Sequence, residues 1–406
     1  MRPTRKAFSI SLGALILFGA GANSQAGWLY VIAAGFVGVV MAGMVLPSLS
    51  LRNLTAQRVA QPAAMVGEPT EVTMLLRNTS RSKKGPFSGQ DAFLGSVTSF
   101  IVNRLPARAT VPITYSIVPD RRGIYEGAPV TVWSGAPFGI ARARRSIAAG
   151  GTLIVHPKWI PISSFPLLES ASTPNEAIHE RPKRGAGMDF YGLREYRSGD
   201  SLRRIHWRAS ARGGKLQVRE YEEQIASRLT LIVDAGEKVG SEPITTFEDS
   251  ISCAVSLVFY ALDTGHPVQI YCDTREGNQR LFEPTRYQTL DWFAGLEADG
   301  RRGLARIAED ARGDIYRRST SVLIFPSTRR NRREAVEAVS ILQDLSSRVV
   351  AVMFSAKSYA EEHNPEALDA DEEEGLALDL FDSRAIVYRV SKEQDLQECL
   401  REPSLV

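Results

Sequence analysis

The sequence predicts an α/β protein with a mostly parallel sheet, preceded by a β-sandwich domain and a two-helix transmembrane hairpin. Three observations predict this order. Two long uncharged stretches open the chain, and short alternating segments separated by turns follow them. From about residue 229 onward, apolar strands alternate with helical segments. Apolar strands interleaved with helices are typical of parallel sheets that are covered on both faces.

The composition is that of an ordinary folded protein. The chain has 406 residues, 44% hydrophobic and 23% charged, a length that suits about two or three domains. The formal net charge is only +3, so affinity for nucleic acid or lipid would have to come from local patches. Its three cysteines (Cys253, Cys272 and Cys399) form no CxxC pair or Cys/His cluster, which disfavours a disulfide framework and a zinc site.

Residues 1–52 are predicted to form a membrane anchor. The stretches Ala7–Ala22 and Gly27–Pro47 contain no charged residue, and the second is long enough to cross a hydrocarbon core of about 30 Å. The flanking residues are basic (Arg2, Arg5, Lys6, Arg52 and Arg58), whereas the connector is neutral. The positive-inside rule then places both ends in the cytoplasm. If the first stretch were instead a cleaved signal peptide, the residues after the second stretch would still face the cytoplasm.

Residues 53–156 are predicted to form a small antiparallel β-sandwich. Apolar residues alternate with other side chains around Val72–Leu76 and again around Val111–Ile117. Turn residues separate such segments, for example at Asn78-Thr79-Ser80. Several short strands at this spacing are typical of a sandwich, and no catalytic constellation is visible among them.

The remaining chain divides into a linker with a basic segment, residues 157–227, and an α/β domain, residues 228–406. Strands are expected at 229–233, 268–272, 321–325, 349–354 and 385–390, with helices at 247–262, 287–296, 304–312 and 332–345. The stretch Glu361–Asp382 contains ten carboxylates and no Lys or Arg. We expect it to be a solvated, partly disordered insertion.

The basic segment Arg181–Arg219 contains eleven Lys or Arg and three Asp or Glu, a local balance of +8. Asp200 is placed to cap a helix that starts near Ser201, and Gly213-Gly214 would end that helix. A strand is expected at Lys215–Tyr221. Ile205 and Trp207 are apolar in a charged stretch, so we expect them to anchor the helix in the core. Arg204, Arg208 and Arg212 are spaced four apart and share another face.

The segment resembles the signature of the bacterial Domain of Unknown Function 58 family. The matching positions are Leu193–Tyr196, Gly199-Asp200, Arg204–Trp207, Ala211-Arg212 and Val218–Glu220. The resemblance implies a von Willebrand factor A-like α/β domain after the signature. It also implies that the gene lies beside a gene for a MoxR-type AAA+ ATPase. The candidate signature and docking residues are Arg194, Glu195, Tyr196, Gly199, Asp200, Arg204, Trp207, Arg208, Arg212 and Arg219.

A metal ion is not expected in the α/β domain. A metal-ion-dependent adhesion site would need Asp-x-Ser-x-Ser after the first strand, with hydroxyl and carboxylate oxygens around Mg²⁺. The chain has Asp234 at the first position, but Gly236 and Lys238 replace both serines, so the site is degenerate. No other cofactor is expected. No catalytic residue is assigned, because His206 has no obvious nucleophile or orienting partner.

These observations predict a non-enzymatic adaptor or scaffold in the bacterial plasma membrane, with its soluble domains in the cytoplasm. The resemblance implies that it works with a MoxR-type AAA+ ATPase in assembling or maturing cell-envelope proteins. We favour an arginine–carboxylate network that docks a protein partner over contact with lipid, and expect no nucleic-acid partner. Two alternatives stay open: a hydrolase that uses His206 and the signature carboxylates, and a receptor for a phosphate or nucleotide ligand.

Overall fold

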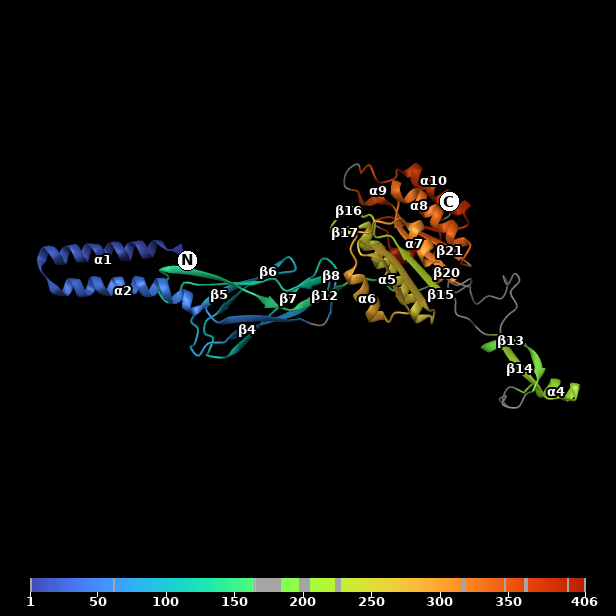
Figure 1. The fold of residues 1–406 in the computed structure, drawn as a ribbon, viewed down its shortest axis with the longest axis horizontal. Helices are drawn as coiled ribbons and strands as arrows, with labels where there is room; N and C mark the ends of the chain where they lie inside the picture. The colour runs from blue at the N-terminus through green and yellow to red at the C-terminus, as the bar shows by residue number, and fades with distance from the viewer. Residues whose placement is uncertain are drawn as a thin grey trace. The chain divides into compact units, whose positions relative to one another are not determined.

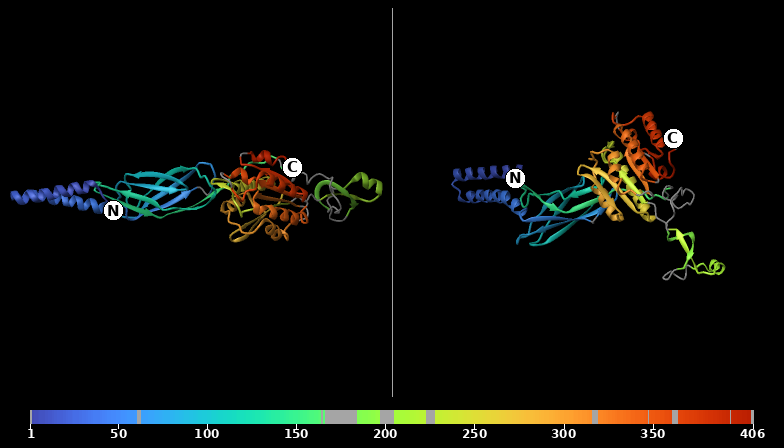
Figure 2. Two further views of the ribbon diagram at one scale, coloured as in Figure 1. Left: turned by 90° about the horizontal axis from the view of Figure 1, so that it is seen from above. Right: turned by 45° about the vertical axis from the view of Figure 1, so that its right-hand side comes forward.

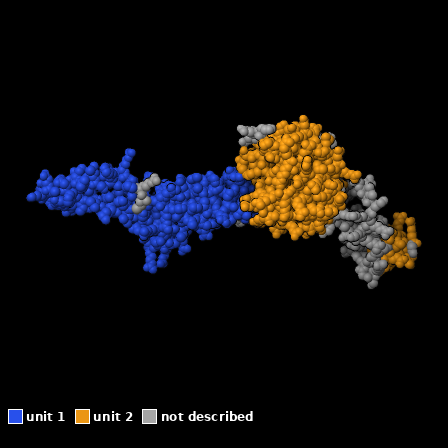
Figure 3. Space-filling view, turned by 45° about the horizontal axis from the view of Figure 1, so that its top comes forward, with its two compact units in different colours: residues 1–158, 291–295 blue, residues 159–290, 296–406 orange. Residues whose placement is uncertain are grey.

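The computed structural model describes residues 2–60, 63–163, 165, 184–196, 205–222, 228–315, 319–346, 348–360, 364–392 and 394–404. The chain divides into two compact units, coloured separately in Figure 3. The first contains residues 1–158 and 291–295, and the second contains residues 159–290 and 296–406. Two apolar helices, several sheets and further helices follow one another along the chain, so the mixed α/β class is confirmed.

The two N-terminal helices lie side by side in Figures 1 and 2, α1 at Arg5–Ser24 and α2 at Gly27–Ser50. Both are long and apolar enough to cross a membrane. Their surfaces expose large apolar side chains, such as Phe8 at 73% and Val31 at 71%. A lipid bilayer would cover such a surface, which favours membrane association.

The segment Gly139-Ile140 contacts Thr4, the N-cap residue of α1, and Gly43 of α2. Thr4 donates its hydroxyl proton toward the carbonyl oxygens of Gly139 and Ile140, each 2.8 Å away. Gly43 of α2 approaches Ile140 so closely that an added Cβ atom would lie 2.7 Å from its side chain. A larger residue at position 43 would therefore force the helix and the strand region apart.

The strands of the first unit form three sheets. Their orders are β1-β10-β9-β5-β6, β11-β2-β4-β7 and β3-β12-β8. The strands are β1 (Arg2–Pro3), β2 (Leu54–Ala60), β3 (Ala63–Met65), β4 (Thr70–Asn78), β5 (Phe87–Phe93), β6 (Ser96–Val102), β7 (Thr110–Ile117), β8 (Gly123–Glu126), β9 (Val130–Ser134), β10 (Ala141–Ile147), β11 (Ala149–Gly150) and β12 (Thr152–His156). Val72, Met74 and Leu76 of β4 are fully buried, as their alternation predicts. The first two sheets contribute side chains to a common apolar core.

A buried ion pair joins those two sheets. Arg58 of β2 and Asp91 of β5 are 4% and 1% exposed, and the guanidinium donates to both carboxylate oxygens. Arg58 also donates to the carbonyl oxygen of Ala149, 2.7 Å away, and Tyr115 donates its hydroxyl proton to Asp91. Burial and the neighbouring Asp91 carboxylate raise the pKa of Tyr115. Each buried charge therefore has several partners, which a charge removed from water requires.

Breaking this pair from one side should destabilise the first unit strongly. We expect Arg58→Met to lower the free energy of unfolding by about 3–5 kcal/mol, because Asp91 would remain charged and buried. Tyr115→Phe removes one hydrogen bond and should cost only about 1–2 kcal/mol. Denaturant unfolding of the full chain, followed by hydrogen exchange of β2 and β5, measures both effects. Equal losses from the two substitutions would contradict the central role of the ion pair.

The second unit contains a six-stranded sheet with the order β19-β18-β15-β20-β21-β22. All neighbouring pairs are parallel except β18 and β19. The strands are β15 (Arg228–Val233), β18 (Val268–Thr274), β19 (Gly277–Phe282), β20 (Ser319–Pro326), β21 (Arg348–Phe354) and β22 (Ile386–Val390), and a hairpin is formed by β16 (Gly240–Ser241) and β17 (Ile244–Thr245). Every strand predicted in this region is present, whereas β19 and the small hairpin were not predicted.

Helices connect and follow these strands, and residues 291–295 at the end of one of them belong to the first unit. The helices are α5 (Thr246–Asp263), α6 (Arg286–Gly295), α7 (Leu304–Ala311), α8 (Arg329–Gln343), α9 (Ala356–Tyr359), α10 (Ala370–Asp382) and α11 (Leu396–Cys399). Side chains of α7, α8 and α10 share one apolar core with the strands. The connection through α5 runs from β15 toward β18, opposite to the connections through α8 and α10. Right-handed crossovers therefore place α5 on the opposite face of the sheet.

The acidic stretch is a helix, which corrects the expectation of a disordered insertion. Asp369 caps α10, and its carboxylate accepts from the backbone N–H of Glu372 at 2.8 Å. Leu376, Ala377 and Leu380 are buried. The many carboxylates concealed this apolar face, and those in the first turn favour helix formation through the helix dipole. Glu361 and Glu362 lie outside the described residues.

Candidate functional site

The signature segment forms an antiparallel hairpin with a short helix. Its elements are β13 (Arg184–Glu195), α4 (Trp207–Gly213) and β14 (Gln217–Glu222), which we call the signature hairpin. Arg194 pairs with Val218 and Leu193 with Arg219 along the strands. The structure describes only the backbone of Arg194 and Arg219, and the candidate residues Gly199, Asp200 and Arg204 lie outside the described residues.

The helix begins later than predicted and has a different cap. Its N-cap is His206, whose ring Nδ1 accepts from the backbone N–H of Ala209 at 3.2 Å. Ile205 lies just before it in a β-bridge with Val218, so α4 starts at Trp207. The predicted cap, Asp200, lies outside the described residues. The predicted end is correct, because Gly214 ends the helix with a φ of 66°.

Ser210 joins the helix to the strand, a role that the sequence analysis missed. Its side chain is shielded, with the residue 8% exposed, and the hydroxyl oxygen accepts from the backbone N–H of Gln217 at 2.8 Å. The same hydroxyl donates to the carbonyl oxygen of His206 at 3.0 Å. The available signal was a serine four residues after the N-cap, but serines at this position are common in helices without a side-chain bond to a neighbouring strand.

Trp207 does not anchor the helix in a core, contrary to our prediction. It is 66% exposed, whereas Ile205 and Val218 are buried at 4% and 3%. Trp207 is the first residue of α4, whereas Ile205 and Val218 pair across the hairpin and are the buried apolar residues there. Leu193 and Leu216 are also exposed, at 40% and 44%.

Positive charge surrounds this exposed tryptophan in the sequence. Arg208 and Arg212 are exposed on α4. Lys215 and Glu195 form an exposed ion pair with 2.6 Å between their charged atoms, and this carboxylate raises the pKa of Lys215. The described part of the hairpin therefore presents apolar and basic side chains together. Tyr196 is half-buried and donates its backbone N–H to the carbonyl oxygen of Leu216 at 2.8 Å.

The stability cost of substitutions at Trp207 and Ile205 should show which side chain lies on the surface and which lies in the core. We expect Ile205→Ala to destabilise the hairpin by about 2–4 kcal/mol, because a buried side chain is lost. Trp207→Ala should change stability by less than about 1 kcal/mol, because the side chain is mostly in solvent. Hydrogen exchange of residues 205–222 in the full chain measures both. Similar loss of protection in the two variants would place Trp207 in the core after all.

A second candidate site lies at the carboxyl ends of β15 and β20, where the strand order reverses. Ligands of open α/β sheets bind at such switch points. Asp234 follows β15 directly and is 3% exposed. Its carboxylate accepts from the backbone N–H of Gly236 at 2.8 Å and from the side-chain amide of Asn331 at 2.7 Å. Burial raises the pKa of Asp234, while these hydrogen bonds oppose the rise.

Arg330 places a fixed cation beside this carboxylate. Its guanidinium donates to the carbonyl oxygens of Gly236, Arg301 and Arg302, at 3.4, 3.0 and 3.2 Å. A Cβ atom on Gly236 would lie 2.7 Å from the guanidinium, so glycine permits this approach. Arg330 lowers the pKa of Asp234 through its charge. The loops after β15, before α7 and at the start of α8 are thus held together by one side chain.

The residues at this switch point do not fit a divalent metal. Gly236 brings no hydroxyl, and Lys238 pairs with Glu242 at 2.8 Å. The two oxygens of Asp234 already accept from an amide and a backbone N–H, and the Arg330 cation lies beside them. Among the described residues, no cluster of three or more His, Cys, Asp or Glu could hold a metal ion.

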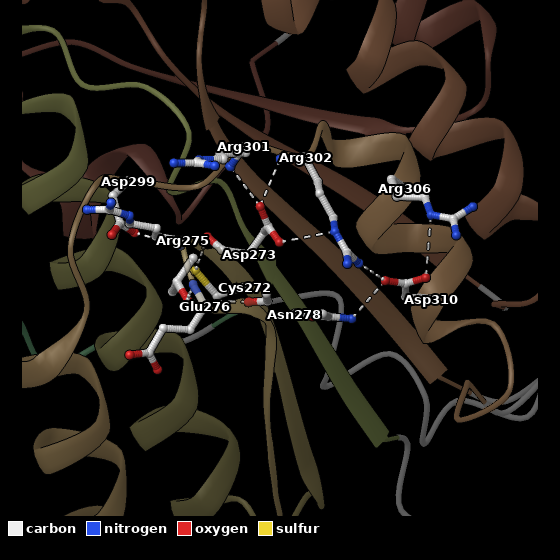
Figure 4. Close-up of polar contacts among 12 residues, drawn as sticks. Cys272, Asp273, Arg275, Glu276, Asn278, Asp299, Arg301, Arg302, Arg306 and Asp310 are labelled. Atoms are coloured by element: carbon white, nitrogen blue, oxygen red, sulfur yellow. Dashed lines mark hydrogen bonds and ion pairs between the residues drawn. The ribbon is translucent and has the colours of Figure 1, made fainter.

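Asp273, at the end of β18, organises the neighbouring loop (Figure 4). It is 1% exposed, and its carboxylate accepts from the backbone N–H groups of Arg301 and Arg302, both at 2.8 Å. Arg302 then reaches Asp310 of α7 at 2.9 Å. The guanidinium of Arg301 is exposed and forms no ion pair or hydrogen bond with the described residues.

Adding a carboxylate beside Asp234 should make stability depend on pH. In Asn331→Asp, two carboxylates would share one buried place, so the pKa of one must rise strongly. An aspartate whose pKa is raised above its unfolded value of 3.8 holds its proton longer in the folded state. Stability is then highest at low pH and falls as pH rises through the interval between the two values. We expect a loss on the order of 3 kcal/mol at pH 7, equivalent to about two pKa units.

Asn331→Ala is the matched control, because it removes the donor without adding a charge. Melting temperatures between about pH 3.5 and 7 should fall more steeply with pH for Asn331→Asp than for Asn331→Ala. Parallel curves for the two variants would contradict close contact between side chain 331 and Asp234.

Comparison with known proteins supports the signature assignment. Residues 192–291 match the family model described as protein of unknown function DUF58. These residues are a DUF58 region. The match begins in β13 of the signature hairpin and ends in α6. The DUF58 region therefore includes β15 and Asp234 as well as α4.

Other comparisons add little to the DUF58 match. No curated protein matches the chain. The CARDB domain of a Pyrococcus furiosus protein, crystallised with di-metal ions, is 12% identical over 24% of this chain and 86% of its own, with a TM-score of 0.17. A GH20 exo-β-N-acetylglucosaminidase from Vibrio harveyi is 9% identical over 80% of this chain and 64% of its own, with a TM-score of 0.21. At such TM-scores, neither likeness bears on fold or function.

Proposed function

We propose that the protein is a membrane-anchored, non-catalytic adaptor that docks a protein partner through its signature hairpin. The observation that carries the proposal is the 66% exposure of Trp207 beside the exposed Arg208 and Arg212. Tryptophan and arginine are the residues most enriched among interface hot spots. An exposed tryptophan contributes little to folding, so a role in binding accounts for it best.

The contacts of the signature residues favour an adaptor over a hydrolase. His206 uses Nδ1 to cap α4, and Glu195 pairs with Lys215. A general base needs a nucleophile or substrate proton within hydrogen-bond reach. These two groups instead have partners that stabilise the hairpin. Because the same arginines are exposed and could also bind a phosphate ligand, a phosphate receptor is a weaker alternative.

The architecture that we propose has a β-sandwich in the first unit and a von Willebrand factor A-like domain in the second. The strand order, with its reversal between β15 and β20, supports a doubly wound sheet of this kind. The common core of two sheets supports the sandwich. The basic residues at positions 2, 5, 6, 52 and 58 support a cytoplasmic location for both.

The proposed partner is a MoxR-type AAA+ ATPase, with cell-envelope protein assembly or maturation as the process. This choice comes from the family resemblance of the signature. The hairpin adds a chemical requirement, because a partner surface for Trp207 and two arginines should combine an apolar pocket with carboxylates.

Affinity purification from native membranes tests the docking role. We expect Trp207→Ala to reduce partner recovery at least ~30-fold, as loss of a hot spot worth about 2 kcal/mol would. Arg208→Glu with Arg212→Glu should act in the same direction through charge repulsion. Arg301→Glu is the matched control, since Arg301 is exposed and forms no ion pair or hydrogen bond with the described residues. If Arg301→Glu loses the partner while the hairpin variants retain it, the interface lies at the switch point instead.

A further inference from the structure

The exposed face of α10 combines carboxylates with large apolar side chains. Asp371, Glu374, Leu378 and Phe381 are exposed at intervals of three and four residues, so they share one side of the helix. We call these four residues the α10 face. Leu378 is 44% exposed and Phe381 is 61% exposed. Solvent-facing positions of a helix are usually polar, so two large apolar residues there need an explanation.

The opposite side of α10 is firmly attached, so the exposed apolar residues are not a sign of a loose helix. Glu373 is 3% exposed, and both its carboxylate oxygens accept from the hydroxyl of Ser355 at 3.0 Å. Ser327 donates to the same carboxylate. Leu376 and Leu380 are fully buried in the core shared with α8. The α10 face is therefore held in a fixed position, with its apolar side chains exposed to solvent.

The signature hairpin has the complementary chemistry. It exposes Trp207, Leu193 and Leu216 together with Arg208 and Arg212. The stretch that contains α10, residues 361–382, has ten carboxylates and no Lys or Arg, whereas residues 181–219 carry a net +8. Apolar residues and opposite charges thus occur together on both surfaces. Such complementarity favours this pairing over contact with a neutral or basic partner.

Chain connectivity allows the two surfaces of one molecule to meet. The hairpin ends at Glu222 and β15 begins at Arg228, so residues 223–227 can span at most about 20 Å. Arg228 lies at the amino edge of the sheet, where α10 also ends before β22. The strands β15 and β22 are three positions apart, or about 14 Å at the usual strand spacing.

The other end of the hairpin also starts near this part of the sheet. Phe165 is fully buried, and its ring lies 6.0 Å from that of Tyr388 on β22. Residues 166–183 then lead to Arg184 at the start of β13, a length that does not limit the reach. The first connection therefore leaves from the amino end of β15. The second leaves from Phe165 beside Tyr388, on the face of the sheet opposite α10, because Val387 and not Tyr388 belongs to the core shared with α10.

We propose that the signature hairpin docks on the α10 face of its own chain, and that a protein partner must displace it. A short tether gives an effective concentration of ~1 mM, so a contact with a dissociation constant of ~0.1 mM would hold the hairpin in place about nine-tenths of the time. Competition with a partner rests on the proposed function, whereas the docking itself does not. The α10 face then acts as an internal acidic ligand that regulates access to Trp207.

Cysteine labelling of the full chain in lipid nanodiscs, without any partner, tests the docking. Cys399→Ser provides the background, because Cys253 and Cys272 are buried. Leu378→Cys reports on the α10 face, and Glu276→Cys, on the exposed turn between β18 and β19, is the control. We expect a maleimide to modify Leu378→Cys ~10-fold more slowly than Glu276→Cys, in line with the tether arithmetic.

Charge reversal sharpens the test. Arg208→Glu with Arg212→Glu should speed the labelling of Leu378→Cys and leave Glu276→Cys unchanged. Adding Asp371→Lys and Glu374→Lys should restore protection, which an unfolded hairpin would not allow. Equal labelling rates at the two cysteines, or no response to charge reversal, would overturn the proposal. Protection that vanishes with one chain per nanodisc would assign the contact to a second copy and overturn docking within one chain.

These outcomes are separate from those of the affinity purification. If labelling shows no protection but Trp207→Ala still loses the partner, the adaptor function stands without internal docking. If labelling shows protection but no hairpin variant affects the partner, the docking stands and the partner binds elsewhere.

Discussion

The buried carboxylate of Asp234 is the constraint on which the α/β unit depends at its switch point. A carboxylate that is 3% exposed needs donors, and the amide of Asn331 and the backbone N–H of Gly236 supply them. Because Asn331 lies in the first turn of α8, this contact fixes where the helix starts above the sheet. Helix α8 shares its core with α7 and α10, so the position of the α10 face follows from the same contact. Arg330 completes the arrangement by joining this corner to the carbonyl oxygens of Arg301 and Arg302.

The first unit uses a buried carboxylate in the same way. Asp91 accepts from Arg58 and Tyr115, which come from a different sheet, and Arg58 extends the network to Ala149. In both units, one charge removed from water joins segments that are far apart in the sequence. Such a charge adds little net stability by itself, but removing its partner is costly, so it specifies one arrangement. The apolar core supplies the stability, and the buried carboxylate selects the geometry.

Apolar patterning predicted the sheet well and the surfaces poorly. The parallel strands are continuous apolar runs, so all five were predicted near their observed positions. The edge strand β19 reads Gly-Asn-Gln-Arg-Leu-Phe, and its half-exposed polar residues conceal it. The carboxylates of α10 concealed an apolar face with helical spacing. In the candidate site, Asp234 was identified as the end of the first strand, but its partners Asn331 and Arg330 are 97 and 96 residues away along the chain, where no local pattern connects them.

The errors at Trp207 and α10 have a common physical origin. Both lie in segments where strong charge of one sign surrounds apolar residues, so burial and exposure cannot be distinguished locally. At Trp207 we predicted burial, and at α10 we predicted no ordered face. In the structure, α4 and α10 are helices and both expose apolar side chains. Places where the local sequence pattern disagrees with the fold are expected at functional surfaces. Folding alone would not select exposed apolar residues there. The two segments carry opposite charges, so their exposed surfaces are complementary to each other.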